Sequence, residues 1–312
     1  MRCFIAGGCG FIGSEMAKKL LQEEENEVVI YDNLSSGSLD LVKGIANDRR
    51  VSIIVGDVKD LKKLTYSMLY CDVVYHFASN ADIAKAMADP TIDFYEGTLL
   101  TQNILEAMRV NGIKKIVYAS GSGTYGCTGL FKAHEELPSF PISTYGASKV
   151  AGEALISAYC HMFDMRGTAY RFANVIGRNS THGVIKDFIA KLKANPKELH
   201  ILGSGDQFKG YMHVNDILDG INQTCFAHAS NYDVMNLAPN SQITVNEIAN
   251  MVVEAMGLEN VKYTYGGGFG GWRGDVPQIV MDSEKARKLG WRPLYTSKEA
   301  VWKSIREMLG KE

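Results

Sequence analysis

The stretch GGCGFIGS, residues 7–14, decides the fold class. It follows a short apolar run at 3–6 and opens a helical pattern over 11–24. A glycine turn between a strand and a helix lets the backbone approach a pyrophosphate closely, and the helix N-terminus offers free N–H groups to the anion. The sequence therefore predicts a dinucleotide site at this turn. Its glycines are Gly7, Gly10 and Gly13.

An acidic residue ends the second apolar run, VVIYD at 28–32. In a dinucleotide fold, a carboxylate here accepts hydrogen bonds from the ribose hydroxyls. Because it would repel the 2′-phosphate of NADP, Asp32 favours NAD as the cofactor. The alternative is that Asp32 only caps the next segment. Asp57 and Val58 follow the third strand where an adenine contact is expected, with an Asx turn as the equal alternative.

Six short runs rich in Val, Ile and Tyr alternate with helical patterns. They are nearly continuous apolar runs, which is typical of parallel strands covered by helices on both faces. Such units build an α/β fold with a Rossmann-type doubly wound parallel sheet. We expect an NAD-binding domain over 1–175 and a smaller mixed α/β substrate-binding domain over 176–312. The segment 212–237 is a candidate for returning to the first domain. The runs are 3–6, 28–32, 51–55, 72–77, 115–120 and 167–173.

Composition restricts the class of partner. The 312 residues include 33 basic and 35 acidic ones, a formal net charge of −2, so charge favours a small molecule over nucleic acid or a membrane surface. Six scattered cysteines without Cys-x-x-Cys spacing favour a reducing, cytoplasmic location. The histidines show no metal-ligand spacing, and there is no Gly-x-Ser-x-Gly elbow, so neither a metal site nor a hydrolase is expected.

A tyrosine and a lysine four residues apart open the helix after the fifth strand. Of fifteen tyrosines, only Tyr145 has a lysine at this spacing, Lys149, within PISTYGASK at 141–149. The spacing places both side chains on one helix face. An ammonium, with a nicotinamide cation nearby, would lower the pKa of the phenol from ~10 and make Tyr145 a general base during hydride transfer. The alternative is an exposed pair on an ordinary helix.

Together these motifs resemble the extended short-chain dehydrogenase/reductase family, and within it the UDP-glucose/UDP-galactose 4-epimerases of the archaeal-type branch. The resemblance covers essentially the whole chain. It implies a homodimer. It also implies an NAD-dependent reaction in which Tyr145 takes the proton of the sugar 4-hydroxyl, and the resulting 4-keto sugar rotates so that hydride returns to its other face. The motifs that carry it are GGCGFIGS, YDNLSSG (31–37), HFA (76–78), PISTYGASK, RFANVIG (171–177), THGVIKDF (181–188) and GWRGDVP (271–277).

The resemblance also assigns binding residues. Asn174 is expected to contact the UDP phosphates or sugar, with a turn-forming asparagine as the alternative, and Val184 to offer a backbone contact near the nucleotide, with a helix-core valine as the equal alternative. Lys209, Arg273 and Asp275 are expected at the diphosphate and ribose, with solvated surface charges as the alternative for the two basic residues. The further implied NAD contacts are Phe11, Ile12, Asn33, Ser35, Ser36, Gly37, Phe77, Ala78, Ser79, Ala119, Ser120, Tyr145, Lys149 and Phe172.

Two positions depart from this family pattern. In YASGSGTYG (118–126), Gly121 stands where relatives commonly carry a serine or threonine close to the reacting hydroxyl. Ser122 is the expected replacement in catalysis and substrate binding, with a bound water as the rival. Losing a hydrogen bond to a charged oxygen costs ~1.5–3 kcal/mol, which slows the reaction about ten- to hundredfold. Gly97 stands where relatives usually carry an asparagine near the cofactor.

The departures leave three functions to weigh. The leading one is C4 epimerisation of UDP-glucose, UDP-galactose or their N-acetyl forms. The runner-up is another NAD-linked nucleotide-sugar reaction, such as decarboxylation or net oxidation. Dehydration is disfavoured because dehydratases place Asp and Glu where Ser122 and Gly123 stand. The third is a non-catalytic NAD-binding sensor or partner protein, which Gly121 and Gly97 motivate.

Overall fold

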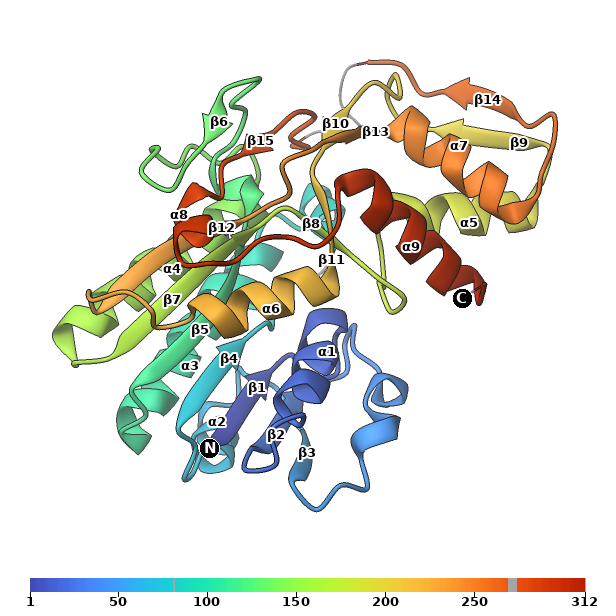
Figure 1. Ribbon diagram of the computed structural model, residues 1–312. Coiled ribbons are helices and arrows are strands. Elements are labelled where there is room, and N and C mark those ends of the chain that lie inside the picture. Colours follow the sequence, from blue (N-terminus) through green and yellow to red (C-terminus); the bar gives the residue numbers. More distant parts are fainter. Residues whose placement is uncertain (81, 269–273, 312) are drawn as a thin grey trace. The chain divides into compact units, whose positions relative to one another are not determined.

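The computed structural model describes residues 1–80, 82–268 and 274–311, and the chain forms two compact units (Figure 1). Neither unit is continuous in sequence. The first consists of Met1–Gly121, Thr144–Arg171 and Ile221–Met235, and the second of Ser122–Ser143, Phe172–Gly220 and Asn236–Glu312. The division of cofactor and substrate roles between two domains stays a prediction.

A seven-stranded sheet, in the order β12-β7-β5-β4-β1-β2-β3, forms the centre of the first unit. Pairing is parallel between β1 and its neighbours β2 and β4, between β2 and β3, and between β4 and β5. The predicted α/β fold with a Rossmann-type sheet is therefore confirmed. The strands are β1 (Arg2–Ala6), β2 (Glu27–Asp32), β3 (Val51–Val55), β4 (Val73–His76), β5 (Lys115–Gly121), β7 (Arg166–Phe172) and β12 (Tyr232–Leu237).

The strand order reverses at β1, which lies between β2 and β4. In open α/β sheets, ligands bind outside the carboxyl ends of the strands at such a switch point. The residues that follow β1, β2, β4 and β5 therefore meet at one edge of the sheet, and this edge contains the predicted glycine turn.

Helices cover the sheet because their apolar faces match its continuous apolar strands. Side chains of α2 (Leu61–Ser67), α3 (Leu99–Asn111) and α4 (Thr144–Met162) share one buried cluster with strand residues such as Phe4 and Val74. The first helix, α1 (Phe11–Leu20), packs against β1 and β2. Within the described ranges, no helix has the length and apolarity needed to cross a membrane.

The second unit is built from short elements around a core of its own. Helices α5 (Val184–Ala194), α7 (Val245–Met256) and α9 (Ser297–Leu309) pack together, while α6 (Val214–Thr224) runs across the division between the units. The strands pair in twos, β8 with β11, β9 with β14, β10 with β13 and β6 with β15. Their bounds are β6 (Lys132–Ala133), β8 (Asn174–Ile176), β9 (Glu198–Ile201), β10 (Phe208–Lys209), β11 (Tyr211–His213), β13 (Ile243–Thr244), β14 (Lys262–Tyr265) and β15 (Val280–Met281).

Candidate active site

The glycine turn after β1 leaves no room for a side chain at Gly7 or Gly13. Gly7 has a φ of +78°, and a Cβ there would lie 2.7 Å from the backbone nitrogen of Ala78. A Cβ on Gly13 would lie 2.2 Å from the carbonyl oxygen of Gly7. The backbone therefore carries no side chain at these two positions beside the start of α1. Phe11 and Ile12 lie in the first turn of α1. Such a cradle fits the pyrophosphate of a dinucleotide.

Asp32 ends β2 and is buried beside this turn. Its carboxylate accepts the backbone N–H of Cys9 at 2.9 Å and that of Leu34 at 2.8 Å. Asp32 therefore does cap the next segment. An ionised carboxylate has about four lone-pair sites, so this capping leaves capacity for the ribose hydroxyls that the sequence predicts.

Asp57 forms the Asx turn that was the alternative to an adenine contact. Its Oδ1 accepts the backbone N–H of Lys59 at 2.8 Å, and its Oδ2 accepts Asn33 Nδ2 at 3.1 Å. Val58 is buried in the core cluster beneath. These contacts link the loop after β2 to the loop after β3, and the adenine role stays a prediction.

The other predicted NAD contacts follow neighbouring strands of the same sheet. Because these strands are parallel, the structure brings together the loops that follow β2 and β4 and the end of β5. Phe172 is the last residue of β7 and is buried. The others are Ser35, Ser36 and Gly37 after β2, Phe77, Ala78 and Ser79 after β4, and Ala119 and Ser120 in β5.

Tyr145 and Lys149 lie in the first turns of α4. Lys149 is 3% exposed, and its Nζ donates to the carbonyl oxygen of Ala119 at 2.8 Å. The same Nζ lies 5.4 Å from the centroid of the Tyr145 ring and 5.1 Å from that of Tyr118. The two side chains are therefore not an exposed helix pair, because the lysine is buried against β5.

The pKa of the Tyr145 phenol is raised to about 12, and the lowering that the sequence predicts beside a nicotinamide cation stays a prediction. Burial is the main cause, the nearby Asp93 carboxylate adds to it, and a hydrogen bond with the Ser79 side chain opposes both. Burial also lowers the pKa of Lys149 to about 8, against the opposing charges of Asp93 and Glu153. A nicotinamide cation close to the phenol would shift the pKa of Tyr145 downward.

Two buried carboxylates near this pair were not predicted from the sequence. Glu153, on α4, accepts Ser120 Oγ at 2.5 Å and pairs with Arg171 of β7 at 2.6 Å. Asp93, just before the π-helical segment Phe94–Thr98 that leads into α3, is 1% exposed and accepts hydrogen bonds on both of its oxygens. The sequence signal was weak, because each carboxylate finds its partners on segments far along the chain.

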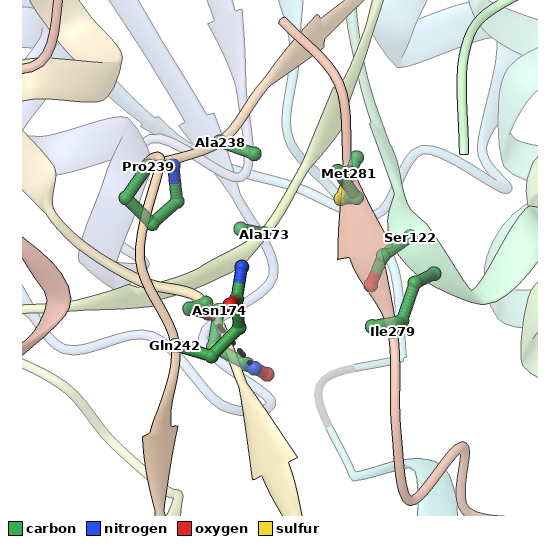
Figure 2. Close-up of a pocket in the computed structure, with 9 residues that line it drawn as sticks. Ser122, Ala173, Asn174, Ala238, Pro239, Gln242, Ile279 and Met281 are labelled. Atoms are coloured by element: carbon green, nitrogen blue, oxygen red, sulfur yellow. Dashed lines mark hydrogen bonds between the residues drawn. The ribbon is translucent and has the colours of Figure 1, made fainter. Parts of the chain in front are cut away.

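A pocket in the second unit contains two of the predicted substrate residues (Figure 2). Asn174 and Gln242 lie on one side of it, and Ser122 lies on the other beside Met281. The Asn174 side chain donates to the carbonyl oxygen of Gly210 at 3.2 Å, and its oxygen remains available as an acceptor. Gln242 and Met281 were not predicted. The remaining residues of the lining are Ala173, Gly210, Ala238, Pro239 and Ile279.

The other predicted substrate residues are placed as follows. Lys209 Nζ forms an ion pair with Asp275 Oδ1 at 2.6 Å, so neither is a solvated surface charge. Val184 is the first residue of α5 and packs against the core of the second unit, which matches the helix-core alternative. Arg273 lies outside the described residues.

Comparison with known proteins decides the family. Residues 3–238 match the NAD dependent epimerase/dehydratase family. The chain belongs to this family. The resemblance seen in the sequence is therefore confirmed, and NAD is the cofactor of this family member.

Several relatives align over nearly their whole length. A crystal structure of a UDP-galactose 4-epimerase is 36% identical, with a TM-score of 0.88, over 100% of this chain and 99% of that one. The NAD complex of the Thermus thermophilus UDP-glucose 4-epimerase is 28% identical, with a TM-score of 0.88, over 99% of both. UDP-glucose 4-epimerase of Lacticaseibacillus casei is 31% identical over 95% of this chain and 92% of that protein.

A dehydratase is also similar. Human dTDP-D-glucose 4,6-dehydratase is 26% identical over 97% of this chain and 89% of that protein. The chain is thus an NAD-dependent nucleotide-sugar modifying enzyme of the epimerase/dehydratase family.

Proposed function

We propose that this enzyme interconverts UDP-hexoses that differ at C4 of the sugar, passing through a 4-keto intermediate. The observation that carries the proposal is the pair at the start of α4, where the buried Lys149 is fixed by the Ala119 carbonyl beside the ring of Tyr145. The names of the epimerases described above support the choice of UDP-hexose as substrate.

In the proposed reaction, Tyr145 removes the proton from the sugar 4-hydroxyl and later returns it to the 4-keto oxygen. When bound, NAD supplies the acceptor and then the donor of the C4 hydride. Burial lowers the pKa of Lys149 to about 8, and the carboxylates of Asp93 and Glu153 oppose this shift, so below that pH Lys149 presents an ammonium to the phenol. The hydrogen bond to Ala119 fixes that ammonium, and the Tyr145 phenolate therefore forms next to a cation that does not need to move.

The proposal assigns nucleotide binding to residues of the second unit. Asn174 and Ser122 line its pocket, and their polar groups suit a sugar or a phosphate. Lys209 can contribute a positive charge to the diphosphate only by sharing or exchanging its partner Asp275. Val184 remains a backbone contact in this proposal, and the homodimer also remains a prediction.

The nearest alternative reaction is dehydration, favoured by the similarity to the human 4,6-dehydratase. Elimination of water needs an acid and a base in addition to the tyrosine. The two residues after Gly121 are Ser122 and Gly123, neither of which is an acid or a base at neutral pH. This loop chemistry supports epimerisation over dehydration.

The test is NMR of the purified protein with UDP-glucose, UDP-galactose and their N-acetyl forms, with and without added NAD. We expect a C4 epimer from at least one of the four. A 4-keto-6-deoxy product would instead indicate a dehydratase. Net NADH accumulation would indicate an oxidase, and unchanged sugars under both conditions would overturn the proposed reaction.

Tyr145→Phe is the matched variant, because it removes only the phenol oxygen. We expect it to lower the turnover number by about 10²- to 10⁴-fold, since general-base catalysis is worth that much. NAD affinity should stay close to that of the wild type, which isothermal titration calorimetry measures. Full activity of Tyr145→Phe would exclude Tyr145 as the base.

A further inference from the structure

A buried asparagine near the end of β12 makes hydrogen bonds to two other segments of the second unit. Asn236 is completely buried, and its Oδ1 accepts the phenol O–H of Tyr125 at 2.7 Å. Its Nδ2 donates to the carbonyl oxygen of Ala133 at 2.9 Å and to that of Asp282 at 2.8 Å. One side chain therefore ties the segment 122–135 to the segment that contains Asp282.

The segments that Asn236 joins form part of the pocket in the second unit (Figure 2). Ser122 opens the first segment, and Met281 lies directly before Asp282 in the second. Ala238 lies two residues after the asparagine. All three line the pocket, whereas the asparagine is buried, so it would affect a ligand through these neighbours.

The turn that contains Ser122 depends on a contact from outside its own sequence. Ser122 begins a 3₁₀ turn, and the backbone N–H of Tyr125 donates to the Ser122 carbonyl oxygen at 3.1 Å. Gly121 precedes Ser122 and Gly123 follows it, and glycines leave the backbone more conformational freedom than other residues do. The bond from the Tyr125 phenol to Asn236 therefore restricts a turn that its glycines alone would leave free.

Asn236 is a fixed anchor because its surroundings are also hydrogen-bonded. Its backbone N–H donates to Glu135 Oε1 at 2.8 Å. The fully buried Ser283 accepts the backbone N–H of Ala238 on its Oγ at 2.8 Å, and the same Oγ donates to the Ala238 carbonyl oxygen at 3.2 Å. The backbone on both sides of the anchor is thus held in place before any ligand arrives.

We propose that Asn236 is a positioning residue of the substrate pocket, which acts through the Tyr125 phenol to hold the Ser122 hydroxyl toward a bound UDP-sugar. The inference rests on the proposed function. Asn236 and Tyr125 keep their protons and form no bond to the substrate, while Ser122 hydrogen-bonds to a sugar or phosphate oxygen. Fixing the turn in advance reduces the entropy that is lost when the UDP-sugar binds.

Tyr125→Phe tests this connection because it removes one oxygen and keeps the ring. The Asn236 contact is lost, the turn is less restricted, and the hydrogen bond from Ser122 to the substrate should weaken. We expect the Kd of UDP-glucose for the NAD-loaded protein to rise about two- to tenfold, as for the loss of one hydrogen bond. Ser122→Ala should raise it by a similar factor. Isothermal titration calorimetry measures both.

A double-mutant cycle separates positioning from a general loss of stability. If Tyr125 acts through the Ser122 hydroxyl, Tyr125→Phe/Ser122→Ala should bind UDP-glucose no more weakly than Ser122→Ala does. If the two residues act independently, their effects on the Kd should multiply. Tyr263→Phe is the matched control, because the Tyr263 phenol also donates to an asparagine of the second unit, Asn250, at 2.8 Å. It should keep the wild-type Kd.

Hydrogen exchange followed by mass spectrometry reports on the turn without a ligand. Tyr125→Phe should accelerate amide exchange in the peptides that cover 122–135, and Tyr263→Phe should not. Asn236→Ala removes all three side-chain hydrogen bonds and should accelerate exchange further. If that variant does not fold, Tyr125→Phe still provides the test, because it removes a single hydrogen bond.

We expect weaker UDP-glucose binding in Tyr125→Phe, no added loss in the double variant, and faster exchange over 122–135. Wild-type exchange there in Tyr125→Phe would overturn the proposal, and so would effects on the Kd that multiply in the double variant. If the wild type epimerises no UDP-sugar, the proposed function fails. The exchange rates of Tyr125→Phe would still decide whether the bond to Asn236 fixes the Ser122 turn.

Discussion

Adding one methyl group to the glycine turn should separate its structural role from its cofactor role. In Gly13→Ala, the new Cβ would lie 2.2 Å from the carbonyl oxygen of Gly7 and 2.9 Å from the Gly8 Cα. Both obstacles are backbone atoms, so no side-chain rotation can relieve the overlap, and the turn must open by about 1 Å. Overpacking of this kind costs about 1–3 kcal/mol of the free energy of unfolding.

The same displacement should weaken NAD binding. If opening the turn removes one hydrogen bond to a charged pyrophosphate oxygen, about 1.5–3 kcal/mol is lost, which makes the Kd of NAD about ten- to hundredfold higher. The matched control is Gly44→Ala, since a Cβ at Gly44 meets nothing within 4 Å. It should leave both stability and NAD affinity close to those of the wild type.

Isothermal titration calorimetry gives the NAD affinity, and urea unfolding gives the stability. The reasoning is refuted if Gly13→Ala loses the expected stability while its Kd for NAD stays within about twofold of the wild-type value. In that case the turn is a packing feature, and the pyrophosphate binds elsewhere. Equal losses in Gly13→Ala and Gly44→Ala would refute the steric argument itself.

Two further outcomes follow from described contacts. Burial alone would raise the pKa of Glu307, but hydrogen bonds from His213 and Lys303 outweigh it and lower the pKa to about 2. This shift contributes up to about 3 kcal/mol to the free energy of unfolding. The contribution is present above pH ~4.5 and is lost as the pH falls toward 2. In urea unfolding, the stability difference between the wild type and Glu307→Gln should therefore shrink as the pH is lowered over that window. Gly97→Asn should lower the free energy of unfolding by about 1–3 kcal/mol, because its Cβ would lie 2.8 Å from Ser148 Oγ. The double variant Gly97→Asn/Ser148→Ala should recover part of that loss. An undiminished Glu307 difference at pH 3, or a Gly97→Asn variant as stable as the wild type, would contradict these two accounts.

The fold was predictable where short runs of sequence determine their own conformation. The strands β1 to β5 and β7 are continuous apolar runs, and their alternation with helical patterns leaves a parallel sheet as the main solution. The interleaving of the two units was harder to predict. The segment 122–143 has no clear period, so no local pattern indicates that it packs with the second unit.

The site residues also divide into those that the local sequence predicts and those that depend on the folded chain. The glycine turn and the Tyr145–Lys149 spacing are local signals, because a strand–turn–helix and an i,i+4 pair place their own atoms. Asp93 and Glu153 act through partners that only the folded chain brings near. The burial that raises the pKa of the Tyr145 phenol was not predictable for a related reason, since it depends on everything packed around the ring and not on the neighbouring lysine alone.

The alternation of the chain between its two units has a consequence for its synthesis. One of the two edge strands of the sheet, β12, is reached only at residue 232, long after β7 ends at residue 172. A nascent chain that has just completed β7 therefore exposes an unpaired strand edge until about sixty more residues have left the ribosome, several seconds at ordinary elongation rates. Neither unit can be produced as a simple truncation, and a shortened chain that ends before β12 should depend on chaperones to remain in solution.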